Sequence, residues 1–240
     1  MSTYFTTAAI TICHQRRGEG DRVYTLLAAN GGRLEAIADG SGKILSKLAG
    51  HLEPFSEAVV TLVQRGTTTK LTGAVCRRRF LNIARTVERM QAAGACLRLC
   101  RELIGVGQDD PQPYALLRDA LTALDDGAAP EVRDAVPTVF ALQLSSLLGW
   151  RPQLDRCGRC NAGVASGSFD LPAGALLCVS CARSVSGAAA LGIETVQYLR
   201  SVLKDPLPAA AAVPASADTR RTAKQMANDL VAYHATAKSA

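Results

Sequence analysis

The sequence has few aromatic side chains and no long apolar segment. Phe, Tyr and Trp make up 5% of its 240 residues, so we do not expect a binding mode that depends on extensive stacking against aromatic rings. No apolar run approaches the ~18 residues that a membrane-spanning helix needs. The opening MSTYFTTAAITICHQRR lacks the leading positive charge and the apolar block of a signal peptide. We therefore expect a cytoplasmic protein with no membrane partner.

Motifs for catalysis are also missing. The three histidines occur in no motif with a Ser or Cys nucleophile. The segment GSGK that ends at Lys43 is superficially similar to a phosphate-binding loop, but Ile37 occupies the position of the first P-loop glycine and Lys43 is followed by Ile rather than Ser or Thr. No dinucleotide-binding glycine motif, His-Glu-x-x-His or paired-carboxylate motif occurs. The sequence therefore gives no reason to expect an enzyme.

Positive charge is concentrated in the first third of the chain. The net charge is +6, and residues 1–80 carry 11 Lys and Arg against 6 Asp and Glu, a net of +5. An excess of this kind favours a polyanionic partner such as nucleic acid or a membrane surface. If a polyanion binds, we expect it to bind mostly to this part of the chain.

Residues 1–80 show the pattern of a small β domain. Five short β-rich runs are separated by polar turns, and Asn30-Gly31-Gly32 is a strong hairpin signal because Asn and Gly tolerate positive φ. The predicted strands are 8–12, 22–29, 33–38, 57–63 and 70–80, with a polar turn over 16–21. Five strands in this length suggest a closed or nearly closed barrel, of which the OB-fold is the commonest version that binds oligonucleotides.

Residues 81–240 change to a helical period. Apolar residues recur at three and four positions from Val87 to Ile104, and helices are also predicted over 114–124, 132–148, 193–203 and 219–235. The Pro- and Ala-rich segment 206–217 is predicted to be a linker or loop. The fold class predicted is thus α+β, with a five-stranded OB-fold barrel (1–80) followed by an α-helical domain (81–240).

Two Cys-x-x-Cys pairs interrupt the helical region at about 155–183. Cys157 and Cys160 form one pair, and Cys178 and Cys181 form the other. Each pair makes a tight knuckle, and four thiolates can close a tetrahedron around Zn²⁺. Since four sulfurs leave no open position, the predicted zinc site is structural. An iron–sulfur cluster or redox disulfides are the less favoured alternatives, and the remaining cysteines, Cys13, Cys76, Cys96 and Cys100, are expected to be core residues.

The basic residues of the first 80 positions lie mostly in predicted loops or at strand ends, where flexible cations suit phosphate contacts. The candidates for DNA binding are Arg16, Arg17, Arg22, Arg33, Lys43 and Lys47. The alternative for any one of them is an ordinary solvated surface residue. Arg77, Arg78 and Arg79 end the domain, and in a regular strand Arg78 would point away from the other two.

Two segments resemble the RecO family of bacterial recombination mediators. The first is GEGDRVYTLLAANGGRL, which begins at Gly18, and the second is GSGKILSKLAGHLEPF, which begins at Gly40. The helical region, the four-cysteine insert and the terminal helix follow in the same order, so the resemblance covers roughly residues 5–205. The loop before Leu-Glu-Pro-Phe carries only two lysines here, fewer basic residues than is usual in the family.

The resemblance implies an OB-fold, a helical domain and a zinc module that together bind single- and double-stranded DNA and anneal complementary strands. It also implies a RecR partner, help in loading RecA, contact with the C-terminal tail of single-strand-binding protein, and association with the nucleoid. The tail is acidic and ends in apolar residues and a carboxylate, so its groove should be apolar with a cation at the rim. The candidate cations are Arg98, Arg101 and Arg118. The alternative function is a zinc-ribbon adaptor without annealing activity.

Overall fold

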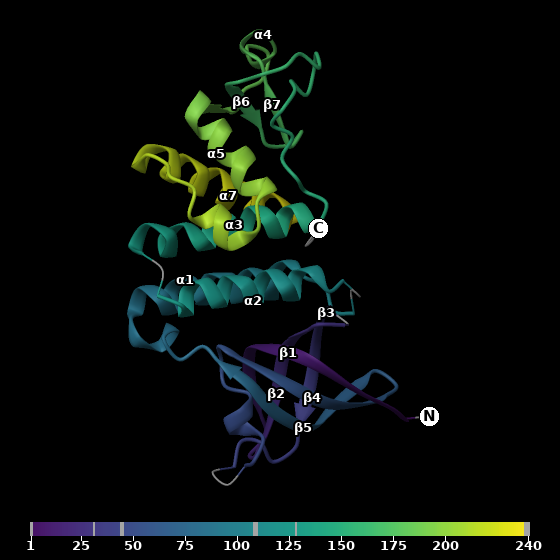
Figure 1. Cartoon of the computed structure of the whole chain (residues 1–240). Helices are drawn as coiled ribbons and strands as arrows, with labels where there is room; N and C mark the ends of the chain where they lie inside the picture. The colour runs from purple at the N-terminus through teal and green to yellow at the C-terminus, as the bar shows by residue number, and fades with distance from the viewer. Residues whose placement is uncertain (1, 31, 44–45, 108–109, 128, 238–240) are drawn as a thin grey trace. The chain divides into compact units, whose positions relative to one another are not determined.

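The computed structural model describes residues 2–30, 32–43, 46–107, 110–127 and 129–237 (Figure 1). The chain divides into two compact units, Met1–Gly127 and Ala128–Ala240. The predicted α+β class is confirmed, since five strands and two helices make up the first unit and most of the second is helical. No helix among the described residues is long and apolar enough to cross a membrane.

Five strands of the first unit form a closed barrel in the order β1-β2-β3-β5-β4. They are β1 (Ser2–Arg17), β2 (Asp21–Ala28), β3 (Gly32–Ala38), β4 (Ser56–Arg65) and β5 (Thr68–Arg79). All neighbours are antiparallel except β3 and β5, which meet through the parallel pairing of Ile37 with Lys70. Side chains that alternate along the strands, such as Tyr24, Leu26, Val60 and Leu62, fill the interior.

The first strand is much longer than the predicted run 8–12. Its first half, Ser2–Ile10, pairs with β4, and its second half, Ala9–Arg17, pairs with β2. The register shifts between Thr11 and Cys13, so Ile12 is an extra residue that lets the strand bend from one partner to the other. The predicted turn over 16–21 is correspondingly shorter, because Arg16 and Arg17 belong to β1 and Asp21 begins β2. Gly31, in the predicted hairpin turn before β3, lies outside the described residues.

The first unit continues past the barrel into two helices, α1 (Val87–Leu103) and α2 (Gln112–Asp125). Two short 3₁₀ turns, η1 (Ala49–His51) and η2 (Ile83–Arg85), connect β3 to β4 and β5 to α1. The Thr86 hydroxyl caps α1 by accepting a hydrogen bond from the Arg89 backbone N–H. The predicted boundary at residue 80 therefore marks the end of the barrel, whereas the compact unit extends to Gly127 because both helices pack with it.

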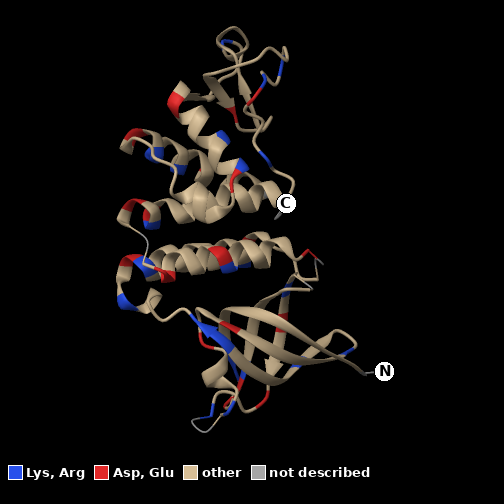
Figure 2. Ribbon diagram, viewed as in Figure 1, with Lys and Arg blue, Asp and Glu red and all other residues tan. Residues whose placement is uncertain are grey.

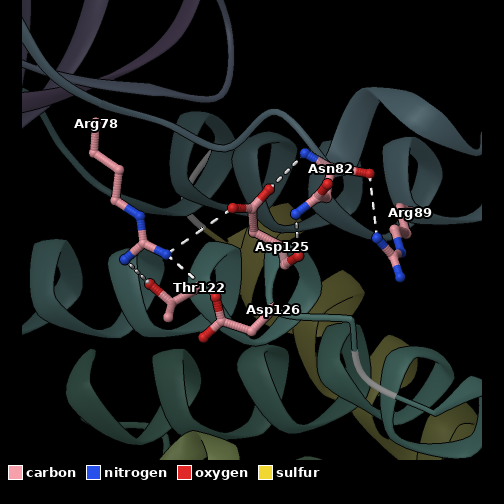
Figure 3. A network of polar contacts seen from close by, with 6 residues as sticks. All are labelled: Arg78, Asn82, Arg89, Thr122, Asp125 and Asp126. Carbon is pink, nitrogen blue, oxygen red and sulfur yellow. Dashed lines mark hydrogen bonds and ion pairs between the residues drawn. The ribbon is translucent and has the colours of Figure 1, made fainter.

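Arg78 fastens the end of β5 to the last turn of α2 (Figure 3). Its guanidinium donates to the Thr122 hydroxyl at 3.1 Å and to an Asp126 carboxylate oxygen at 3.4 Å, and it lies 4.6 Å from the centre of the Phe80 ring. The Asp125 carboxylate accepts from the Asn82 backbone N–H at 2.7 Å. A cation beside the C-terminus of a helix also interacts favourably with the helix dipole. Arg78 is therefore engaged inside the first unit.

The second unit is built on four helices: α3 (Pro130–Leu147), α5 (Ile193–Lys204), α6 (Leu207–Ala211) and α7 (Ala217–Ala237). Helix α3 is buried on most sides and contacts the other three. The prediction of a loop over 206–217 is wrong for its first part, which forms α6. Pro206 precedes this helix, and Leu207, Ala210 and Ala211 bury one face against α3. Packing supplies the stability that so short a helix lacks by itself.

The cysteine region lies between α3 and α5 and has its own small sheet. The strands β6 (Gly167–Asp170), β7 (Ala175–Leu177) and β8 (Ala189–Leu191) pair antiparallel in the order β7-β6-β8, and α4 (Val179–Ala182) follows β7. Phe169, Leu176 and Leu177 of these strands are buried. These short strands and the short helix are not among the elements that the sequence predicted, because they are held by non-local pairing.

Candidate functional site

The two cysteine knuckles bring four sulfur atoms together. The Sγ atoms of Cys157, Cys160, Cys178 and Cys181 all lie within 4.8 Å of one another. A tetrahedral zinc site with bonds of about 2.3 Å has sulfur–sulfur edges of about 3.8 Å, and the Cys160 and Cys178 sulfurs are 3.8 Å apart. The donor set and its spacing therefore fit one tetrahedral metal ion.

Backbone hydrogen bonds fix the orientation of the first knuckle, which carries Cys157 and Cys160. The Cys157 backbone N–H donates to Ala162 O at 2.8 Å, and the Cys157 carbonyl oxygen accepts from the Asn161 N–H at 2.9 Å. Asn161 adopts a left-handed conformation, φ 58°, which Asn tolerates better than most residues. Backbone N–H groups of Cys160, Cys178 and Arg159 point at the Cys157 sulfur and lower its pKa to about 6. This sulfur is thus prepared as a thiolate, the form that binds metal.

Two of the other cysteines are buried in the core of the first unit, outside the sulfur cluster. Cys96 and Cys100 are fully buried on α1. Burial raises the pKa of the Cys96 thiol to about 12 and raises that of Cys100 as well. Both are therefore protonated, unreactive core residues at neutral pH, in line with the expectation from the sequence.

Close packing between β6 and β7, the strand that ends just before Cys178, yields a test. A Cβ at Gly167 would lie 2.0 Å from the Leu177 carbonyl oxygen, whereas a Cβ at Gly163 would meet nothing within 4 Å. Gly167→Ala should therefore separate β6 from β7 and lower the free energy of unfolding by about 1–3 kcal/mol, while Gly163→Ala should have little effect. Thermal unfolding followed by circular dichroism measures both. Equal melting temperatures for the two variants would contradict this packing.

A basic cluster lies where the β1–β2 turn meets the loop after β3. Its members are Arg16, Arg17, Arg22 and Lys43. The two segments are joined by hydrogen bonds from Gly42 N–H to Gly20 O at 2.8 Å and from Gly40 N–H to an Asp21 carboxylate oxygen at 2.7 Å. The Lys43 side chain lies over the turn, since a Cβ at Gly20 would be 3.2 Å from its Cε. Arg16 pairs directly with Arg22 across the two strands. Like charges in such a pair are mutually destabilising, so an anion bound beside them relieves repulsion.

The predicted basic residues do not all join this cluster. Arg16, Arg17 and Lys43 are exposed at the turn and loop, Lys47 is exposed four residues further along the loop, and Arg22 is half-buried beside them. Ile44 and Leu45 of this loop lie outside the described residues. Figure 2 shows Lys and Arg on this loop and on the end of β5.

Arg33 is placed differently. It lies at the opposite end of the β2–β3 hairpin from Arg22, and its guanidinium donates to Arg101 O at 2.7 Å, at the end of α1. The structure thus gives Arg33 a bond to a helix terminus and separates it from the other five basic residues.

An apolar groove opens between the barrel and α1. Its volume is about 760 Å³, and Ile12, Pro54, Phe55 and Leu97 line it. Phe55 has φ 60°, an uncommon conformation for a residue with a bulky side chain, and its carbonyl accepts from Phe80 N–H at 3.0 Å. Backbone strain of this kind often accompanies ligand-binding positions.

Two of the three predicted tail-binding cations lie at this groove. Arg98 and Arg101 line it and are exposed, three residues apart on α1. Among the described residues, Arg118 does not line the groove, and it pairs with Asp119 at 3.5 Å on α2. Ile12 and Phe55 are groove residues that the sequence did not predict. The bulge at Ile12 leaves no mark in the sequence, although Phe55 ends the Leu-Glu-Pro-Phe segment.

Two family models and several curated proteins match this chain over most of its length. Residues 1–80 match the family model "Recombination protein O N terminal", and residues 84–239 match "Recombination protein O C terminal". The chain is 32% identical over 224 residues to DNA repair protein RecO of Myxococcus xanthus, covering 90% of this chain and 86% of the relative. It is 33% identical to the protein of that name from Anaeromyxobacter dehalogenans strain 2CP-C over 221 residues, with the same coverage. The relative from Roseiflexus sp. is 30% identical over 218 residues, covering 90% and 76%.

Proposed function

The chain belongs to the RecO family of DNA repair proteins, and from this premise we propose that it binds single- and double-stranded DNA and anneals complementary strands. The observation that carries the proposal is the basic cluster on the OB-like barrel. There, two segments far apart in sequence are hydrogen-bonded together and place Arg16, Arg17 and Lys43 on one exposed edge. Cations on loops of such a barrel suit contacts to phosphates.

Annealing follows from charge neutralisation. Two single strands repel each other through their phosphates, and cations that contact both strands lower this repulsion. Complementary bases then pair by themselves, so the activity needs neither bond chemistry nor ATP. Little aromatic surface is available for stacking in this unit, since Tyr24, Phe80 and Tyr114 are buried, although Tyr4 is exposed. We therefore propose that binding is mainly electrostatic and tolerant of sequence.

We further propose that the four cysteines hold a structural Zn²⁺. Their sulfurs fit a closed tetrahedron, and when bound the ion supplies a cross-link between the two knuckles. Cys157 and Cys160 hold one side, and Cys178 and Cys181 hold the other. Because all four positions around the ion belong to the protein, the site has no place for a substrate, and we propose that the protein is not an enzyme.

The groove beside α1 suits the C-terminal tail of single-strand-binding protein. An apolar floor at Ile12, Phe55 and Leu97 fits the apolar end of the tail, and Arg98 and Arg101 fit its carboxylates. Together with RecR, the protein would then act on DNA coated with single-strand-binding protein at the nucleoid and help RecA to load.

If the tail binds in this groove, removal of its two cations should weaken binding of the tail. Arg98→Gln combined with Arg101→Gln should weaken binding of a synthetic tail peptide at least tenfold, because two exposed charge-assisted contacts are lost. Arg85→Gln combined with Arg118→Gln makes the same change in net charge away from the groove and should bind normally. Fluorescence anisotropy of a labelled peptide measures both. If the second pair weakens binding as much as the first, the groove is not the binding site.

Strand annealing tests the proposed function as a whole. Purified protein is mixed with two complementary oligonucleotides at several salt concentrations and without ATP. We expect acceleration that fades steeply as salt rises. Neither acceleration nor DNA binding near 50 mM salt would overturn the proposal and favour an adaptor that acts through protein partners.

A further inference from the structure

The Arg200 side chain on α5 contacts the backbone on both sides of the first cysteine knuckle, Cys157 to Cys160. Its neighbours Leu199 and Val202 are fully buried, which fixes the helix in place. One terminal nitrogen, Nη2, donates to Leu154 O and to Val164 O, each at 2.6 Å. These two carbonyls lie just before Cys157 and just after Cys160, so a single guanidinium nitrogen joins the two ends of the loop that carries both sulfurs.

Other hydrogen bonds also hold this loop. Arg156 Nη1 donates to Asn161 O at 3.2 Å, Gly158 N–H donates to Leu176 O of β7 at 3.0 Å, and the loop's own backbone closes on itself. Cys157 N–H bonds to Ala162 O at 2.8 Å, and Val164 N–H bonds to Asp155 O at 3.3 Å. A short hairpin of this kind is only marginally stable in water. Arg200 Nε also lies 3.0 Å from the Asp155 carboxylate, but that side chain is 85% exposed and the ion pair contributes little. The two charge-assisted bonds to carbonyls are the stronger contacts.

We infer that Arg200 is a positioning residue for the metal centre, which holds Cys157 and Cys160 in the orientation that a metal ion needs. Groups that orient metal ligands without touching the ion typically change metal affinity 10–100-fold when they are replaced. The same contacts connect the metal module to α5, so the order of the loop depends on the helical part of its unit. This inference rests on the proposed zinc site.

Zinc affinity of the full chain provides the test, measured by competition with a chromophoric chelator. Arg200→Gln should weaken zinc binding at least tenfold and speed hydrogen exchange of amides in 155–164, with α3 exchange unchanged. Asp155→Asn removes only the exposed ion pair and should behave as the parent chain. Arg151→Gln removes an exposed charge before the loop and should do the same.

Arg200→Lys keeps the charge but has no planar fork, and it should fold normally with an intermediate affinity. If Arg200→Gln does not fold in saturating zinc, the zinc affinity of Arg200→Lys tests the role of Arg200 instead. Affinity and exchange of a folded Arg200 variant equal to those of Arg151→Gln would overturn the role of Arg200. A parent chain that binds no zinc would instead overturn the zinc site, and with it this inference.

Discussion

A chain in which glutamine replaces four exposed cations, three of the basic cluster and Lys47 further along the same loop, should anneal complementary strands about 100-fold more slowly near 0.1 M salt. The replaced residues are Arg16, Arg17, Lys43 and Lys47. Each phosphate contact releases a counterion when it forms, and the loss of four such contacts lowers affinity by this order at moderate salt. Annealing followed by the fluorescence of a donor–acceptor oligonucleotide pair measures the rate.

The matched control makes the same change in net charge elsewhere. It carries glutamine at Arg85, Lys204, Arg221 and Lys224, which are exposed on other elements. We expect a loss of less than about threefold, because long-range electrostatics are screened beyond about 10 Å at this salt concentration. Equal losses in both variants would show that total charge, rather than the cluster, drives annealing.

Cys157→Ser combined with Cys160→Ser should abolish zinc binding and unfold the metal module. Only two thiolates would remain, and structural zinc contributes about 10 kcal/mol or more to the folding of small zinc modules. Zinc content by mass spectrometry should fall from one equivalent to none, and the melting temperature of the second unit should fall. Barrel strand signals in hydrogen exchange should persist, because the first unit has its own core.

Cys13→Ser combined with Cys76→Ser is the control for this change. Both residues are half-buried in the barrel unit and lie outside the sulfur cluster, so zinc content should stay at one equivalent. An equimolar zinc content that survives the Cys157 and Cys160 double replacement would refute the assignment of these ligands.

Features encoded within a few residues could be predicted from the sequence. The alternation of apolar residues and the turn glycines located the five strands, and the Cys-x-x-Cys spacing identified the two knuckles. The helical period placed α1 and α2 within a few residues of their observed ends. In each case the determining interactions are local, so the signal is present in the sequence itself.

Features that depend on distant contacts could not be predicted. The length of β1 reflects its pairing with two different strands, and the bulge at Ile12 follows from that pairing. Helix α6 forms in a Pro- and Ala-rich segment because α3 covers it. The groove joins Ile12, Phe55 and Leu97 from three separate segments. Arg33 and Arg78 look like surface cations in the sequence, yet each bonds to the last turn of a helix.

The salt dependence of single-stranded DNA binding tests the central claim most directly. For the parent chain, the logarithm of the affinity should fall linearly with the logarithm of salt concentration. For the variant with glutamine at Arg16, Arg17, Lys43 and Lys47, the slope should be shallower by about 3, since each contact contributes about 0.7 for single strands. Equal slopes for parent and variant would show that the cluster does not contact the phosphates, and would contradict the account.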